Sequence, residues 1–173
     1  MKKSILALTV STAVLSSLFP VTTFASDSNV ATTTSIQQLD SSDPTPDPKS
    51  TVGQAGLFAD STPGEVKPTS SVEGNLGTAT IYYVGSKTLY WSLVPKFIGP
   101  YFVHGEITIT NTKSGKVVDV IPINTGKILG GKVSDQVSVS SLPKGSYNAV
   151  FSGSFIYDPG TGTIGNPNAY FEI

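Results

Sequence analysis

The C-terminal part of the chain, from Asn75 to Ile173, has an apolar period of two residues. This alternation is typical of half-buried strands, and the β-branched and aromatic residues that favour strands dominate it. Glycine-containing segments such as Gly85-Ser86-Lys87 and Thr112–Gly115 separate the runs and predict hairpin turns. Seven runs are predicted to be strands: Thr78–Val84, Thr88–Val94, Tyr101–Thr110, Lys116–Ile123, Val133–Ser140, Ser146–Ile156 and Ala169–Ile173.

The same alternation predicts which side chains point into the core. Four of the runs contribute inward rows, namely Leu89, Trp91 and Leu93; Val103, Ile107 and Ile109; Tyr147, Ala149, Phe151, Gly153 and Phe155; and Ala169, Phe171 and Ile173. No run after the first 25 residues has the helical period. Short strands with a turn every ten residues or so indicate an all-β, antiparallel β-sandwich.

The segment Leu142-Pro143-Lys144-Gly145-Ser146-Tyr147 places a tyrosine at the start of a strand, just after a glycine turn. It resembles the tyrosine corner of immunoglobulin-like and fibronectin-type sandwiches, in which the phenol hydroxyl bonds to nearby backbone. Secreted bacterial immunoglobulin-like domains are similar in this segment and in strand count. The resemblance implies an immunoglobulin-like sandwich of about seven strands. It implies no particular function, because such sandwiches have many unrelated roles.

The preceding segment, residues 26–74, has the composition of a spacer. It is rich in Ser, Thr and Pro, and it holds seven acidic residues against two lysines. Prolines 44, 46 and 48 oppose regular structure, and the low apolar content leaves little to offset the entropy of ordering. We therefore expect a disordered spacer before a domain at 75–173. The apolar patch Ala55–Ala59 leaves two alternatives open, an ordered arm or plain linker.

Residues 1–25 have the three parts of a secretory signal peptide. Two lysines follow Met1, an apolar run extends from Ile5 to Phe19, and Thr23-Phe24-Ala25 offers small residues for cleavage. A membrane-spanning helix is the alternative, but it needs about 20 apolar residues. The run here is shorter and is diluted by Ser and Thr. We expect a signal peptide of the Gram-positive type and an extracellular product with no membrane span after cleavage.

The amino-acid composition argues against most kinds of catalytic, metal and nucleic-acid site. The chain has no cysteine and only one histidine, His104, which alternation places on the outward side of its strand. Without a base beside a nucleophile, we expect no enzyme activity and no cofactor. The lysines of the domain are scattered, unlike the basic stripe of a nucleic-acid-binding protein. Asp158, in a Gly- and Asn-rich loop, is a weak metal candidate that a hairpin loop also explains.

Aromatic residues are the remaining candidates for a binding surface. By alternation Tyr82, Tyr90, Phe102 and His104 point outward from their strands. Exposed rings stack on sugars or anchor a protein partner. Two alternatives remain open: cross-strand aromatics that stabilise the sheet, or coverage by the spacer.

These observations favour a non-catalytic extracellular interaction domain that acts in adhesion, matrix binding or partner binding. Its expected partner is a protein or a glycan at the cell surface or in the matrix. One alternative is a carbohydrate-binding module that uses the aromatic face. Another is a secreted toxin-like effector. The oligomeric state is left open.

Overall fold

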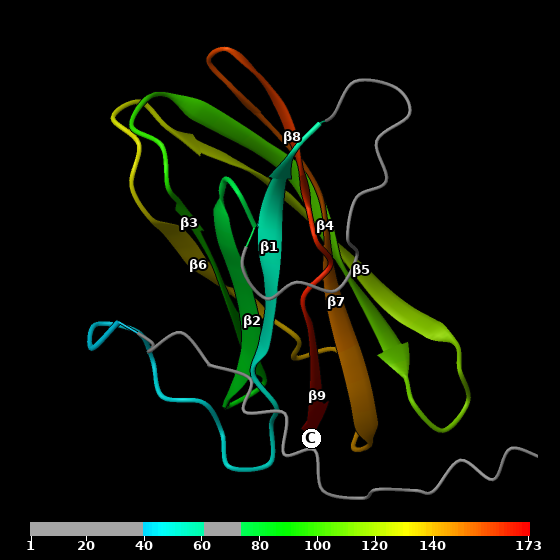
Figure 1. The fold of residues 1–173 in the computed structure, drawn as a ribbon. Coiled ribbons are helices and arrows are strands. Elements are labelled where there is room, and N and C mark those ends of the chain that lie inside the picture. The colour runs from blue at the N-terminus through cyan, green and yellow to red at the C-terminus, as the bar shows by residue number, and fades with distance from the viewer. Residues whose placement is uncertain (1–39, 61–73) are drawn as a thin grey trace, which may run out of the picture. The chain divides into compact units, whose positions relative to one another are not determined.

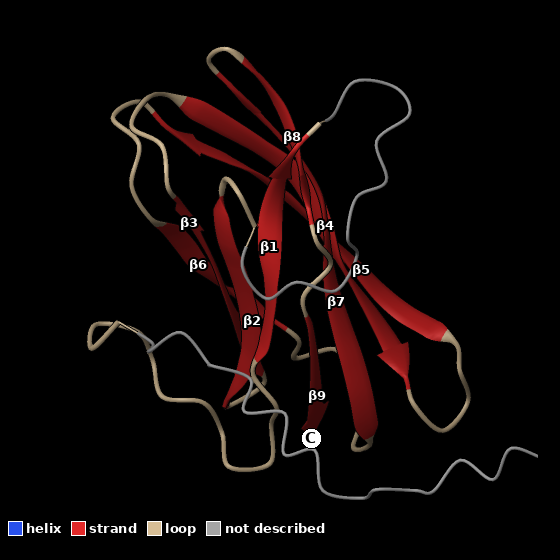
Figure 2. Ribbon diagram, viewed as in Figure 1, coloured by secondary structure: helices blue, strands red, loops and turns tan. Residues whose placement is uncertain are grey.

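The computed structural model describes residues 40–60 and 74–173. The predicted signal peptide and two parts of the predicted spacer, residues 26–39 and 61–73, lie outside the described residues. Everything described belongs to one compact unit, Thr34–Ile173. Within these two ranges every regular element is a strand (Figure 2). The described residues include no helix long and apolar enough to cross a membrane.

Nine antiparallel strands form one curled sheet (Figure 1). Their order across the sheet is β5-β4-β7-β8-β1-β2-β3-β6, and β9 pairs with β7 beside β8. β5 and β6, the two ends of this order, come near each other without forming a ladder, so the sheet is a nearly closed barrel. The strands are β1 (Gly53–Ala59), β2 (Gly77–Gly85), β3 (Thr88–Pro95), β4 (Tyr101–Asn111), β5 (Val117–Lys127), β6 (Val133–Ser138), β7 (Ser146–Tyr157), β8 (Gly160–Ile164) and β9 (Asn168–Glu172).

The all-β antiparallel class and the seven predicted strands are confirmed, as β2 to β7 and β9. The predicted inward rows are confirmed as well, because their large apolar side chains form one buried core. Trp91 of β3 meets Phe151 of β7 across this core with ring centroids 5.3 Å apart. Tyr83 of β2 stacks on Phe171 of β9 at 4.9 Å. The first contact joins opposite walls of the barrel, and the second joins β2 to β9.

β1 lies inside the range expected to be spacer, and this corrects the expected boundary at residue 75. It pairs with β2 on one side and with β8 on the other, and Leu57 is buried in the core. Of the two alternatives for Ala55–Ala59, the ordered one is confirmed. The strand is glycine-rich because neighbours approach closely: a Cβ at Gly56 would lie 2.4 Å from the backbone nitrogen of Gly74.

β8 lies inside the expected loop from Asp158 to Asn168. Glycine has a low strand propensity, so the glycines of β8 gave no sequence signal for a strand. Packing nevertheless requires glycine at position 162. A Cβ there would lie 2.3 Å from Cζ of Phe155. Because β8 also pairs with β1, the two halves of the expected sandwich are joined into one sheet.

The predicted tyrosine corner is confirmed at the start of β7. The Tyr147 hydroxyl donates a hydrogen bond of 2.9 Å to the carbonyl oxygen of Pro143, and the ring is buried. Gly145, in the turn between them, exchanges two backbone hydrogen bonds with Ile173, of 3.1 and 3.0 Å. The corner therefore fixes the turn before β7 next to the last residue of the chain.

Removing the hydroxyl with Tyr147→Phe should lower the free energy of unfolding by about 1 kcal/mol, because one buried hydrogen bond is lost while the ring stays packed. Urea unfolding followed by fluorescence measures the change. Tyr170→Phe, whose ring is half exposed on β9, is the matched control and should leave stability unchanged. Equal stability of the Tyr147 variant and the wild type would contradict the structural role of the corner.

Candidate functional site

Two of the predicted binding residues, Tyr82 and Tyr90, are direct cross-strand partners on β2 and β3. Their ring centroids lie 5.0 Å apart on the outer side of the sheet. The expectation that they are exposed is corrected, since the side chains are 0% and 4% exposed. Residues 40–52, which we call the strap, lie over them. The alternative that the spacer covers these rings is therefore confirmed for the strap.

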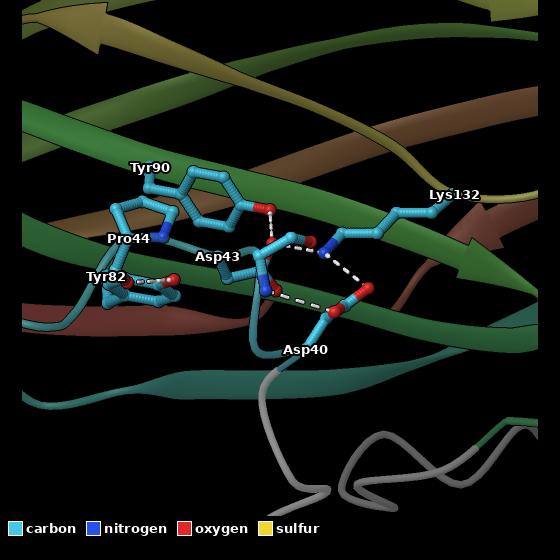
Figure 3. Close-up of polar contacts among 7 residues, drawn as sticks. Asp40, Asp43, Pro44, Tyr82, Tyr90 and Lys132 are labelled. Carbon is cyan, nitrogen blue, oxygen red and sulfur yellow. Dashed lines mark hydrogen bonds and ion pairs between the residues drawn. The ribbon is translucent and has the colours of Figure 1, made fainter.

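The strap is held on the two tyrosines by polar contacts (Figure 3). The Tyr82 hydroxyl donates to the carbonyl oxygen of Pro44 at 2.7 Å. The Tyr90 hydroxyl donates to Oδ1 of Asp43 at 2.5 Å. The Lys132 ammonium donates to the same carboxylate oxygen and lies 4.0 Å from Oδ2 of Asp40. Asp43 thus accepts from Tyr90 on β3 and from Lys132, which directly precedes the neighbouring strand β6.

Electrostatics favour this arrangement. Lys132 lies over the Tyr90 ring, 5.9 Å from its centroid, which is within cation–π range. Burial disfavours the Lys132 ammonium, but its contacts with Asp43 and Tyr90 outweigh burial and raise the pKa of Lys132 above its usual value. Burial, together with the charge of Asp43, raises the pKa of Tyr82 well above its usual range. At neutral pH the lysine is therefore charged and Tyr82 is a neutral donor.

The rest of the strap is fixed by hydrogen bonds of the backbone, two of which use side-chain hydroxyls of the strap as acceptors. The Asp47 amide donates to the carbonyl oxygen of Tyr83 at 2.8 Å, and the Tyr83 amide donates to Oγ of Ser50 at 3.1 Å. Farther along, Thr51 and Tyr170 of β9 exchange two hydrogen bonds of 2.9 and 2.8 Å. The strap therefore leads from the outer face of β3, across β2, to β9 and then into β1.

Phe102 and His104, the other two predicted binding residues, lie on β4 and are exposed as expected. Nδ1 of His104 lies 2.5 Å from the side-chain oxygen of Asn124 on β5. Since β4 is next to neither β2 nor β3 in the sheet, these two residues do not share a surface with Tyr82 and Tyr90. The sequence therefore predicted one binding surface from four residues that lie on two separate surfaces.

A groove with a volume of about 700 Å³ lies beside Phe102, where the ends of β4, β5 and β7 meet. Ile156 of β7 is the direct cross-strand partner of Phe102, and Gly126 of β5 is its partner on the other side. A Cβ at Gly126 would lie 3.2 Å from the Phe102 ring, so this ring rests over bare backbone. Lys127 and Asp158 also line the groove.

Two loops extend the apolar surface beyond the groove. Gly130, between β5 and β6, packs on the backbone of Ile98 and Gly99, between β3 and β4. Phe97 anchors its loop by packing on rings of β4 and β7. We call the result the end surface: five apolar side chains, 50% to 97% exposed, namely Ile98, Phe102, Ile128, Leu129 and Ile156. They lie in or next to the β3–β4, β5–β6 and β7–β8 connections, which are at the end of the sheet away from the C-terminus (Figure 1).

Sequence reasoning found only Phe102 among these five. Ile156 had a usable signal, because it alternates with the inward residue Phe155 and so points outward. Ile98, Ile128 and Leu129 lie in glycine-containing loops, where no periodicity exists to place them. Two apolar residues in succession within a loop, Ile128-Leu129, are the signal that was available.

Asp158, the weak metal candidate, is exposed at the turn between β7 and β8. Across residues 40–60 and 74–173, no group of three or more His, Cys, Asp or Glu side chains is arranged to hold a metal ion. In this structure Asp158 is a groove residue with Lys127 on the other side of β4.

Neutralising Asp43 with Asp43→Asn should lower the free energy of unfolding by about 1.5 kcal/mol, because a largely buried, charge-assisted contact is lost. Backbone amides of Asp47 and Thr51 should exchange faster with solvent, which hydrogen exchange measures. Asp135→Asn removes the same charge from an exposed neighbour on β6 and should change neither quantity.

A double-mutant cycle of Asp43→Asn with Lys132→Gln isolates the pair. Because the pKa of folded Lys132 lies above the usual 10.5, the coupling should be complete at neutral pH and should fall as pH rises past 10.5 and through the raised value. A coupling of zero at neutral pH would contradict a stabilising role for this contact.

A scan against protein-family models found no match, and neither did searches of curated proteins and of solved structures. The functional conclusions therefore rest on the residues and geometry described above.

Proposed function

We propose that this protein is a secreted, non-catalytic interaction domain that binds a protein or a glycan at the cell surface or in the matrix through its end surface. One observation carries the proposal: five large apolar side chains, 50% to 97% exposed, lie at one end of the sheet, and three of them, Phe102, Ile128 and Ile156, line a groove. Clustered apolar exposure of this kind is a mark of interaction sites.

The end surface has the make-up of a binding site rather than of a frayed end. Phe102 provides an aromatic anchor, and Ile128 and Ile156 line the shallow groove beside it. Below it, Phe97 packs on Tyr101 and Tyr157, so the loop that presents Ile98 has a fixed base. A rigid base lowers the entropy that a partner must offset on binding.

The carbohydrate-binding alternative now depends on Phe102 and His104. A ring stacks on a sugar only when its face is accessible, and Tyr82 and Tyr90 are covered by the strap. Phe102 is accessible, with the polar pair of His104 and Asn124 two residues along the same face. The toxin-like alternative has no observation of its own in its favour.

We also propose that the immunoglobulin-like character lies in the way two halves of the sheet face each other. The half β1-β2-β3-β6 provides Trp91, and the half containing β7 and β4 provides Phe151. The tyrosine corner at Tyr147 supports this proposal, since such corners belong to sandwiches.

If the chain is exported, protein expressed from the full sequence in a Gram-positive host should accumulate in the medium and begin at Ser26. Mass spectrometry of the medium protein measures the start. Ala25→Arg places a large charge at the cleavage site and should leave the 18.0 kDa precursor uncleaved. Ala31→Arg, six residues on, should be processed normally. Cell-bound wild-type protein with an intact N-terminus would contradict export.

Replacing the anchor with Phe102→Ser should weaken binding at least about tenfold, since a central aromatic residue is worth about 2 kcal/mol or more in an interface. The assay uses wild-type protein recovered from the medium, with immobilised fibronectin, collagen and a glycan array as probes. Because Phe102 is half exposed, its replacement should leave the thermal midpoint nearly unchanged.

Tyr170→Ser is the matched control. This ring is 52% exposed, close to Phe102 at 50%, but it lies on β9, away from the groove. Binding should survive this change. Equal binding by the wild type and the Phe102 variant, or no binding to any probe, would count against the proposal.

A further inference from the structure

We propose that the end surface pairs with a second copy of this chain, about a twofold axis, with Lys127 of each copy against Asp158 of the other. The inference rests on the proposed function, because it names a partner for the same surface. It is carried by the apolar centre of the groove and by the two opposite charges that flank it.

Among the described residues, the structure shows no ion pair between these two charges within one copy. Lys127 ends β5 and Asp158 follows β7, and both strands pair with β4, which lies between them. Two strand spacings separate their backbones by about 10 Å. Among residues 40–60 and 74–173 the structure has no ion pair that uses either side chain, and both are exposed.

A twofold axis through the apolar centre of the groove would bring Lys127 of each copy next to Asp158 of the other. In an isologous interface each residue that contacts a second residue is contacted by it in return, so one reciprocal pair supplies two ion pairs. The lysine side of each groove then faces the aspartate side of the other. Phe102 and Ile156 of both copies are buried between them, and burial of apolar area drives association.

The charge pattern favours a second copy over a lipid surface. An anionic membrane attracts an apolar patch surrounded by lysines, because each basic residue near the surface adds attraction. Here Asp158 lies on the rim opposite Lys127, so the attraction to such a surface is cancelled in part. The same opposite charges are complementary to a rotated copy of themselves.

Self-association through the free edge of β5 is opposed by the structure. A bulge interrupts its register opposite Ile109 and Thr110, and Pro122, in mid-strand, has no amide hydrogen to donate. Asp119 is paired with Ile109 and so takes the inward side of the strand. A bulge, a proline and an inward charge are the features that protect edges from strand addition.

The test is sedimentation velocity of protein recovered from the medium, over a wide concentration range. The wild type should form a dimer as concentration rises. Lys127→Glu and Asp158→Lys should each weaken the dimer about tenfold, because two attractive pairs become repulsive. An equimolar mixture of these two variants should dimerise again, since every contact is then between opposite charges. Lys144→Glu, an exposed lysine near the C-terminus, is the matched control and should behave as the wild type.

A wild-type chain that stays monomeric at every concentration would overturn the inference. So would a dimer that both single variants leave intact, or a mixture that fails to recover. Probe binding separates this failure from failure of the proposed function. If the chain is monomeric but binds a probe in a manner that depends on Phe102, the function stands and the self-pairing falls. If the chain dimerises but the Phe102→Ser variant binds every probe normally, the self-pairing stands and the proposed function falls.

Discussion

The pairing of β1 with both β2 and β8 is the constraint on which the rest of this structure depends. Leu57 marks the overlap, since it pairs with Gly77 on one side and with Ile164 on the other, and its side chain enters the core. Without β1, β2 and β8 would both be open edges and the two halves of the sheet would be joined only by packing. Because the strap precedes β1 directly, the register of β1 also decides where Pro44 and Thr51 make their contacts.

Alternation along the sequence was enough to find β2 to β7 and β9, together with the inward rows, because those strands bury one face and period-two patterning reports burial directly. The tyrosine corner was found because it is local: Tyr147 reaches back only four residues. β1 and β8 were missed because they contain glycine where a neighbouring backbone or ring leaves no room for a Cβ, as at Gly56 and Gly162. These glycines are needed because a segment distant in the sequence packs closely against them. A local sequence pattern contains no information about such a contact.

The prolines of the strap have two effects, one of which opposes regular structure while the other favours an ordered strap. Its prolines oppose helix and ladder formation, which is why residues 40–52 were expected to be disordered. The same prolines restrict the unfolded chain, so that less entropy is lost when the strap is fixed on the sheet. Ordering a residue costs about 1–2 kcal/mol of backbone entropy. The hydrogen bonds from Tyr82 and Tyr90 and the contact of Asp43 with Lys132 work against that cost. These contacts span 38 to 89 residues in sequence, beyond any local rule.

The candidate site was half predictable for the same reason. Alternation correctly placed Tyr82, Tyr90 and Phe102 on outward sides of their strands, but outward and exposed are different properties once a segment from elsewhere crosses the sheet. Tyr82 and Tyr90 carry hydroxyls that donate to the strap, so covering them leaves no buried polar group unpaired. Phe102 and Ile156 offer no such donor, and among the described residues none covers them. A surface of this kind gains free energy only when an apolar counterpart excludes water from it. This supports the proposal that the molecule interacts through its end surface rather than through the face that carries Tyr82 and Tyr90.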